Sequence, residues 1–219
     1  TSTTESIPLI ASSIMSKKIA AGANKIVLDV TYGSGAFMKT KERAQELADT
    51  MIKIGKLANR ETVAVITPME QPLGKNVGNS LEVTEAVQAL KGEIAYDVKQ
   101  VVLELGSNML KLAGKGDELE ENKQKMLENI QNGKALAKLK ELVQNQGGDI
   151  SYIEDTSKFK KAKHILPVVL ESEGIIKELK AEKIGKLSVF LGAGRIKKEE
   201  KIESEVGIVL NKKIGDKVR

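Results

Sequence analysis

Two short apolar runs separated by an amphipathic helix constrain the fold of this chain more than any other feature. Lys25–Val30 and Thr62–Thr67 are nearly continuous aliphatic runs, which is typical of strands buried on both faces of a parallel sheet. Between them, apolar residues recur at helical spacing: Ala44, Leu47, Ala48, Met51 and Ile52. A strand, a helix and a second strand in this order predict a parallel α/β arrangement.

Further helices are expected on both sides of this unit. Ser6 supplies a capping hydroxyl and Pro8 suits a first turn, so a helix is expected from Ser6 to about Ala21. With 41% hydrophobic but only 3% aromatic residues, the core must be aliphatic, which suits helices packed on a sheet. Polar start signals and apolar periodicity predict more helices beginning near Asn79, after Asp97, at Asp117 and near Gly133.

The last third of the chain has a different pattern, which begins after about Asp155. Apolar runs bounded by glycines predict strands at His164–Glu171, Gly174–Lys180 and Lys186–Leu191, and a helix is expected at Ile202–Val209. The fold class expected from the whole sequence is α/β. We expect a mixed, mostly parallel sheet flanked by helices, with a more β-rich C-terminal unit.

The charge pattern argues against nucleic acid or membrane as a partner. The net charge is +5, but the 35 basic residues are interleaved with 30 acidic ones, as in Lys197–Lys201, which is typical of solvated helix faces. No apolar run approaches the roughly 20 residues that span a bilayer. The absence of cysteine excludes disulfides and thiolate metal sites, and it fits a cytoplasmic location.

Ser13 and Lys17 are four residues apart on the first predicted helix and therefore share a face. A hydroxyl donates and accepts, whereas an ammonium only donates, so the pair could hold a planar ring with a carbonyl beside an N–H. By itself, however, this spacing more often describes a solvated helix face.

Two other features have ordinary interpretations that we favour. Gly33–Gly35 follows a strand and precedes a helix, where backbone amides can bind phosphate, but so short a glycine run is usually a simple turn. His164 is the only histidine and has no cysteine or second histidine to share a metal ion, so a structural or surface role is expected.

Taken as strings, several segments are far more specific than their single residues. They follow one another along nearly the whole chain: Ser6–Ile10, Ser16–Lys18, Ile26–Val30, Gly33–Met38, Gln71–Gly74, Asn145–Asp149, Leu191–Arg195 and Lys212–Asp216. In these segments the chain resembles the pyrimidine-nucleoside phosphorylase and thymidine phosphorylase family.

The resemblance implies a pentosyl transfer in which phosphate attacks the anomeric carbon of uridine or thymidine. The products are the free base and a pentose 1-phosphate, phosphate is the co-substrate, and no organic cofactor is needed. In the family, positions matching Ser13 and Lys17 contact the pyrimidine, and the position matching Phe37 lines the base pocket. Hydrogen-bond donors aimed at the base stabilise the charge that develops as it leaves.

The resemblance also implies a structural cation, bound by backbone carbonyls at positions matching Leu73 and Asn76 and by a carboxylate matching Glu85. One departure from the family lies just before the glycine turn. Lysine is usual where this chain has Thr31, so a positive charge is lost there.

The family's domain plan implies that residues 1–22 are a remnant of a helical dimerisation lobe. Residues 23–155 are then a central α/β domain and residues 156–219 an incomplete C-terminal α+β domain. The family's phosphate-binding segments would lie upstream of Thr1, so we expect a chain truncated at both ends and inactive by itself, its catalytic residues unknown. A homodimer is expected for the parent protein.

Three other functions are carried as alternatives. An archaeal AMP phosphorylase shares much of the pattern and would take a nucleotide. A non-catalytic binding or structural lobe would keep the fold without the chemistry. Nucleic-acid binding ranks last, because it requires clustered basic residues with stacking aromatics nearby.

Overall fold

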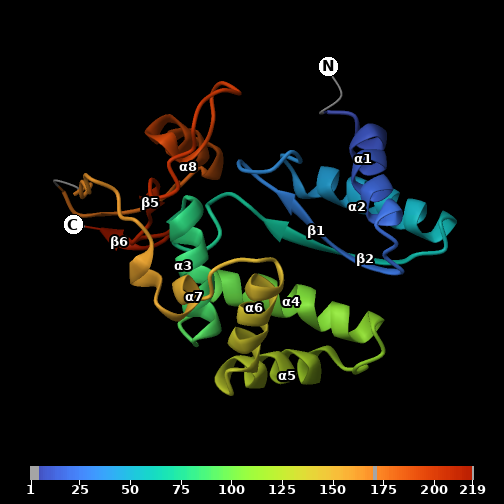
Figure 1. The fold of residues 1–219 in the computed structure, drawn as a ribbon. Coiled ribbons are helices and arrows are strands. Elements are labelled where there is room, and N and C mark those ends of the chain that lie inside the picture. Colours follow the sequence, from blue (N-terminus) through green and yellow to red (C-terminus); the bar gives the residue numbers. More distant parts are fainter. Residues whose placement is uncertain (1–4, 170–171, 219) are drawn as a thin grey trace. The chain divides into compact units, whose positions relative to one another are not determined.

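The structure is a computed structural model that describes residues 5–169 and 172–218 (Figure 1). Its strands are β1 (Lys25–Tyr32), β2 (Glu61–Pro68), β3 (Asn76–Val77), β4 (Gly174–Ile175), β5 (Ile208–Val209) and β6 (Lys217–Val218). Its α-helices are α1 (Ile7–Ala20), α2 (Lys41–Leu57), α3 (Asn79–Leu90), α4 (Tyr96–Leu112), α5 (Leu119–Gln131), α6 (Lys134–Asn145), α7 (Ser151–Glu154) and α8 (Ala181–Ser188). Two short turns are η1 (Thr156–Lys158), a 3-10 turn, and η2 (Val189–Ala193), a π-type turn. The predicted α/β class is confirmed.

The chain divides into two compact units. Unit 1 comprises Thr1–Glu70 and Lys99–Leu127, and unit 2 comprises Gln71–Val98 and Glu128–Arg219. The parallel strand pair belongs to unit 1, and the two-residue antiparallel pairs, β3 with β5 and β4 with β6, belong to unit 2.

Unit 1 is built on the predicted strand–helix–strand motif. β1 and β2 are parallel, from Lys25 opposite Glu61 to Tyr32 opposite Pro68. Alternate residues of β1 point to one face and pack with the apolar stripe of α2 and with α1. The resulting buried cluster contains Ile7, Ala11, Met15, Ile26, Leu28, Val30, Met38, Ala44, Leu47, Ala48 and Met51.

The α4–α5 connection of unit 1 is fixed by a buried amide. Asn122 has no exposed surface, and its Nδ2 donates to the carbonyls of Ser107, at 3.2 Å, and Gly116, at 2.9 Å. A Cβ atom at Gly116 would come within 2.1 Å of the Asn122 Oδ1 atom. The turn between these helices therefore requires a glycine at this position.

The predicted strand at Lys186–Leu191 is wrong. The segment lies in α8 and η2, and the Lys186 ammonium pairs with Glu182 one helical turn earlier, with Nζ and Oε1 2.6 Å apart. Ile184 and Leu187 are spaced as on a helix face, whereas the alternation after Lys186 is too short to distinguish a strand from a helix.

The predicted strand at His164–Glu171 is also wrong for residues 164–169, which form no strand, and Glu171 lies outside the described residues. Pro167 lacks an N–H and cannot donate to a sheet. Its neighbours Leu166 and Val168 are 85% and 94% exposed. Of the strand predicted at Gly174–Lys180, only Gly174–Ile175 is paired.

The predicted helix at Ile202–Val209 is wrong as well, because its last two residues form β5 and pair with Asn76–Val77. A Cβ atom at Gly207 would lie 2.2 Å from the Val77 carbonyl oxygen, so only glycine permits this close approach of two backbones. A pairing remote in sequence thus outweighs local helical spacing. In the described part of the chain, every helix is too short or too polar to cross a bilayer.

Candidate functional site

α1 presents Ser13 and Lys17 to solvent, on the same face, as predicted from their spacing. The helix begins with a proline in its first turn and buries Ile7, Ala11 and Met15, which recur every four residues. Because this stripe faces the core of unit 1, the hydroxyl and the ammonium lie outside it. Neither side chain bonds to another described residue, so both are available to a ligand.

Phe37 lies in unit 1 between β1 and α2, and its side chain is 75% exposed. A large aromatic ring gains stability from burial, so an exposed ring is available to pack against a ligand. Whereas Ser13 and Lys17 share a helix face, Phe37 comes from a separate segment.

The glycine turn after β1 uses its amides internally. The N–H of Gly33 donates to the Met38 carbonyl at 3.0 Å, and the N–H of Gly35 donates to the Met69 carbonyl at 2.9 Å. The Ser34 hydroxyl donates to the Glu70 carbonyl at 2.8 Å. These bonds tie the turn to the end of β2, which supports the interpretation as a structural turn rather than a phosphate cradle.

Gly33 is required in that turn for two reasons. Its φ of 116° is in the region that favours glycine, and a Cβ atom there would lie 2.8 Å from the Glu70 Oε1 atom. α2 begins only later, at Lys41, where the Thr40 hydroxyl accepts a bond from the Arg43 N–H at 3.3 Å. The N-terminus of α2 is therefore capped by its own chain.

Sequence reasoning missed a polar pair on the parallel strands. The Thr67 hydroxyl donates to the Asp29 Oδ1 atom at 2.5 Å, and Thr31 lies opposite Thr67 in the register. In parallel α/β sheets, ligands bind at the carboxyl ends of the strands, where this pair lies. The signal available in the sequence was a polar residue near the end of each apolar run, Asp29 in the first and Thr67 in the second.

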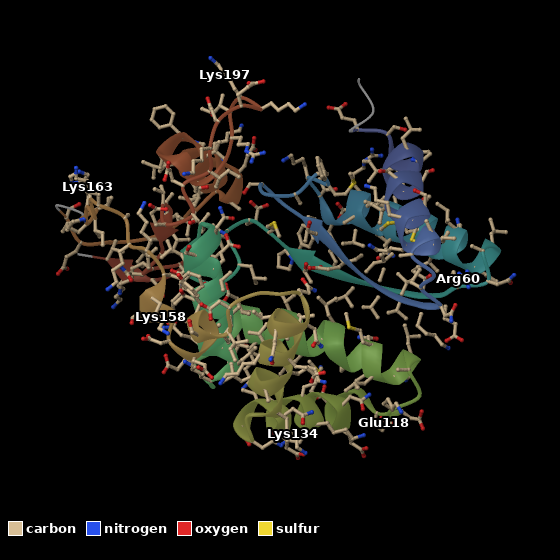
Figure 2. All side chains as sticks on the ribbon, in the orientation of Figure 1. Arg60, Glu118, Lys134, Lys158, Lys163 and Lys197 are labelled. Atoms are coloured by element: carbon tan, nitrogen blue, oxygen red, sulfur yellow. The ribbon has the colours of Figure 1, made fainter. Side chains whose placement is uncertain are left out.

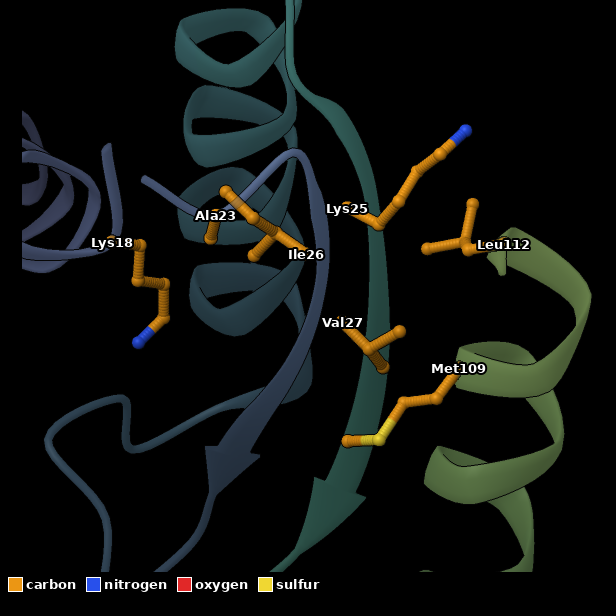
Figure 3. Close-up of a pocket in the computed structure, with 7 residues that line it drawn as sticks. All are labelled: Lys18, Ala23, Lys25, Ile26, Val27, Met109 and Leu112. Atoms are coloured by element: carbon orange, nitrogen blue, oxygen red, sulfur yellow. The ribbon is translucent and has the colours of Figure 1, made fainter. Parts of the chain in front are cut away.

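A shallow cavity of about 320 Å³ lies elsewhere in unit 1 (Figure 3). Its lining is mostly apolar and comes from the first residues of β1 and the end of α4, namely Lys18, Ala23, Lys25, Ile26, Val27, Met109 and Leu112. It opens at the amino end of β1, opposite the end where α/β sheets bind ligands. None of Ser13, Lys17 and Phe37 lines it.

In unit 2, the structure brings together Glu85 and Asn76, two of the three residues for which a cation was predicted. The two carboxylate oxygens of Glu85 accept the N–H groups of Lys75, at 2.8 Å, and Asn76, at 2.9 Å. Leu73 precedes these amides in the same segment, residues 71–76, which leads into β3. The carboxylate therefore holds the backbone of the segment directly.

A second carboxylate and an ammonium bind the same segment. The Asp97 Oδ2 atom accepts the Gly74 N–H at 3.1 Å and the Lys213 ammonium at 3.1 Å, and Lys213 also donates to the Pro72 carbonyl. Partial burial raises the pKa of Asp97, but the Lys213 hydrogen bond and charge, with the Val98 and Gly74 amides, outweigh it. The net result is a pKa below the usual aspartate value.

The carboxylate oxygens around the 71–76 segment do not fit a metal ion well. Both oxygens of Glu85 already accept N–H groups, and no group of three or more acidic, histidine or cysteine side chains suited to a metal occurs among the described residues. The Lys213 ammonium already supplies a positive charge to the segment. The cation expected at Leu73, Asn76 and Glu85 stays a prediction.

Three basic side chains of unit 2 can be located individually in the structure. Lys158, Lys163 and Lys197 come from three separate segments and lie apart from one another (Figure 2). His164 is exposed, in agreement with the surface role favoured for it.

Comparison with known protein families gives matches to an N-terminal and a C-terminal stretch of the chain. Residues 1–136 match the glycosyl transferase family, a/b domain, and residues 175–219 match the pyrimidine nucleoside phosphorylase C-terminal domain. Pyrimidine-nucleoside phosphorylases from Bacillus subtilis (strain 168) and Staphylococcus aureus (strain USA300) are 54% and 51% identical to it over 218 residues. The match covers 100% of this chain but 50% of each relative, so the chain spans about half their length. The chain therefore belongs to the pyrimidine-nucleoside phosphorylase family of glycosyl transferases.

Proposed function

We propose that this chain is part of a pyrimidine-nucleoside phosphorylase. The observation that carries the proposal is the identity of 54% and 51%, over the whole chain, to two relatives that bear this name. The reaction joins a phosphate oxygen to the anomeric carbon of uridine or thymidine and breaks the bond to the base nitrogen. The base leaves with the electron pair and takes up a proton.

Ser13 and Lys17 are proposed to bind the pyrimidine. Their exposed positions on one face of α1 support this role, because a ligand can reach both without moving the core of unit 1. An ammonium aimed at a base carbonyl stabilises the negative charge that grows there as the glycosidic bond breaks. The hydroxyl can accept from the ring N–H or donate to a carbonyl.

Phe37 is proposed as a wall of the base pocket. Its ring, at the carboxyl end of β1, offers a flat apolar surface on which a pyrimidine can stack. Loss of the ring should weaken binding of the base without removing any hydrogen bond to it.

The remaining assignments follow the same family membership. We propose inorganic phosphate as co-substrate, no organic cofactor, a cytoplasmic homodimer as the working form, and neither nucleic acid nor membrane as a partner. We keep the division into residues 1–22, 23–155 and 156–219 as the proposed domain plan of the parent protein.

The test is an assay of free-base release by this chain joined to the N-terminal segment of the Bacillus subtilis relative. Uridine, thymidine and AMP are each supplied with and without phosphate. The expected result is phosphate-dependent release of uracil or thymine. Turnover of AMP alone would move the assignment to an AMP phosphorylase, and release from none of them would leave a non-catalytic lobe.

Site variants of the same fusion test the residues. Ser13→Ala and Lys17→Met should each lower kcat/KM by about tenfold or more, because each removes a bond to the departing base. Ser12→Ala is the matched control, since Ser12 is also exposed on α1 but lies on a different face. Equal activity of the Ser12 and Ser13 variants would reject the proposed role of Ser13.

A further inference from the structure

The 71–76 segment is fastened by residues that are far away in sequence. The N–H of Leu210 donates to the Lys75 carbonyl at 2.7 Å, and the N–H of Ile214 donates to the Gln71 Oε1 atom at 2.9 Å. Between these two positions, Lys213 extends its side chain to the same segment. The C-terminal part of unit 2 thus bonds to the segment at Gln71 and Pro72 and again at Lys75.

The Lys213 ammonium occupies a partly enclosed polar position. It donates to the Pro72 carbonyl and to the Asp97 carboxylate, which lies 116 residues away in sequence. The side chains of Lys213 and Asp97 are 21% and 32% exposed. Ion pairs that are this enclosed are screened less by water and salt than surface pairs.

A backbone carbonyl and a carboxylate that converge on one point are the ligands of a hard cation. Here a lysine ammonium donates to them instead, and Glu85 binds two amides of the same short segment. A metal ion bound by the Pro72 carbonyl and the Asp97 carboxylate would be close to the Lys213 ammonium that donates to both groups, and repulsion would oppose its binding.

We propose that the Lys213 ammonium is the resident cation of the 71–76 segment, and that the segment keeps its conformation without a bound metal ion. Lys213 is a positioning residue, because it acts through Pro72 and Asp97 rather than on a substrate. The proposal is independent of the proposed activity, since it concerns the order of a segment of this chain alone.

The test is hydrogen exchange of the Gly74, Lys75 and Asn76 amides in the 219-residue chain. Exchange is measured after chelation in a buffer whose only cation is tetramethylammonium, and again with added potassium, magnesium or calcium. The wild-type rates should be the same in all of these buffers. Lys213→Met should speed exchange of the three amides about tenfold or more, as expected for loss of a charge-assisted hydrogen bond.

Two further variants separate a cation from a general structural role. Lys213→Arg, which keeps the charge, should restore slow exchange, whereas Lys212→Met, the exposed neighbour, should leave the rates unchanged. The double variant Lys213→Met, Asp97→Asn should change the exchange rates by less than the sum of the two single effects, because both substitutions remove the same hydrogen bond.

Two outcomes would overturn the proposal. One is faster exchange of the wild-type amides when metal ions are removed, reversed by adding one of them. The other is a Lys213→Met chain whose three amides exchange at the wild-type rate. If Lys213→Met does not fold, the wild-type measurement in the different buffers still decides between a resident ammonium and a metal ion.

Discussion

Unit 1 and unit 2 are each stabilised internally by a different kind of interaction. Unit 1 buries a contiguous aliphatic cluster under its parallel strands, with Ala11 and Met15 completely enclosed. In unit 2, the buried hydrophobic residues of the described chain are Val87, Ile153 and Leu210. Residues 71–76 of unit 2 are instead fixed by hydrogen bonds that their amides donate to carboxylates and by one that the Lys213 ammonium donates to the Pro72 carbonyl.

This difference indicates which kinds of change should destabilise each unit. Apolar burial is non-directional and scarcely depends on pH, so unit 1 should respond mainly to changes in the volume of its core. Hydrogen bonds to charged groups depend on geometry and protonation, so unit 2 should respond to charge and acid. Unit 2 also exposes large apolar side chains, including Ile165, Leu166 and Val168.

The largest expected effect is the loss of core volume in unit 1. Met15→Ala removes a side chain with no exposed surface, and it should lower the free energy of unfolding by about 2–5 kcal/mol. Leu57→Ala, at a position that is 85% exposed, is the control and should change it by less than about 0.5 kcal/mol. Denaturant unfolding measures both, and equal losses would remove the distinction between core and surface.

A pair of helical glycines should give opposite results in the two units. In Gly55→Ala, the new Cβ would lie 2.1 Å from the Thr62 Oγ1 atom, so the variant should lose about 1–3 kcal/mol. In Gly185→Ala, nothing lies within 4 Å of the new Cβ, so the variant should gain roughly 0.5–1 kcal/mol. Thermal unfolding of the two variants should therefore shift in opposite directions, and a shift in the same direction would contradict this.

The acid response should distinguish unit 2. The pKa of Asp97 is lowered in the folded chain, so its contribution to stability is complete above the unfolded pKa of about 3.9 and is lost as pH falls through the folded pKa. Asp97→Asn should flatten the fall in stability below about pH 4. Unfolding curves at several pH values measure this, and an unchanged profile would show that Asp97 contributes nothing to it.

The smallest expected effect on stability comes from the proposed base-binding residues. Ser13→Ala and Lys17→Met should change the free energy of unfolding by less than about 0.5 kcal/mol, because both side chains are exposed outside the core stripe of α1. Calorimetry of the two variants checks this. A large loss from either would mean that the residue holds unit 1 together rather than binding a ligand.

The features that sequence predicted correctly are local. The strand–helix–strand motif of unit 1 follows from apolar periodicity, and the shared face of Ser13 and Lys17 follows from the geometry of one helix. The family could also be identified from sequence, because ordered strings along the whole chain are specific even where single residues are not.

Only the tertiary structure decided the features that depend on distant partners. β5 exists because Ile208–Val209 meets β3, and the 71–76 segment is ordered by Asp97 and Lys213, which no local pattern relates to each other. The sequence alone left open whether the Gly33–Gly35 turn is structural or binds phosphate. In the folded chain, the Gly35 N–H is occupied by its bond to the Met69 carbonyl. Periodicity and capping act over one or two turns, whereas these contacts join residues far apart in the chain, so their energies appear only once the chain has folded.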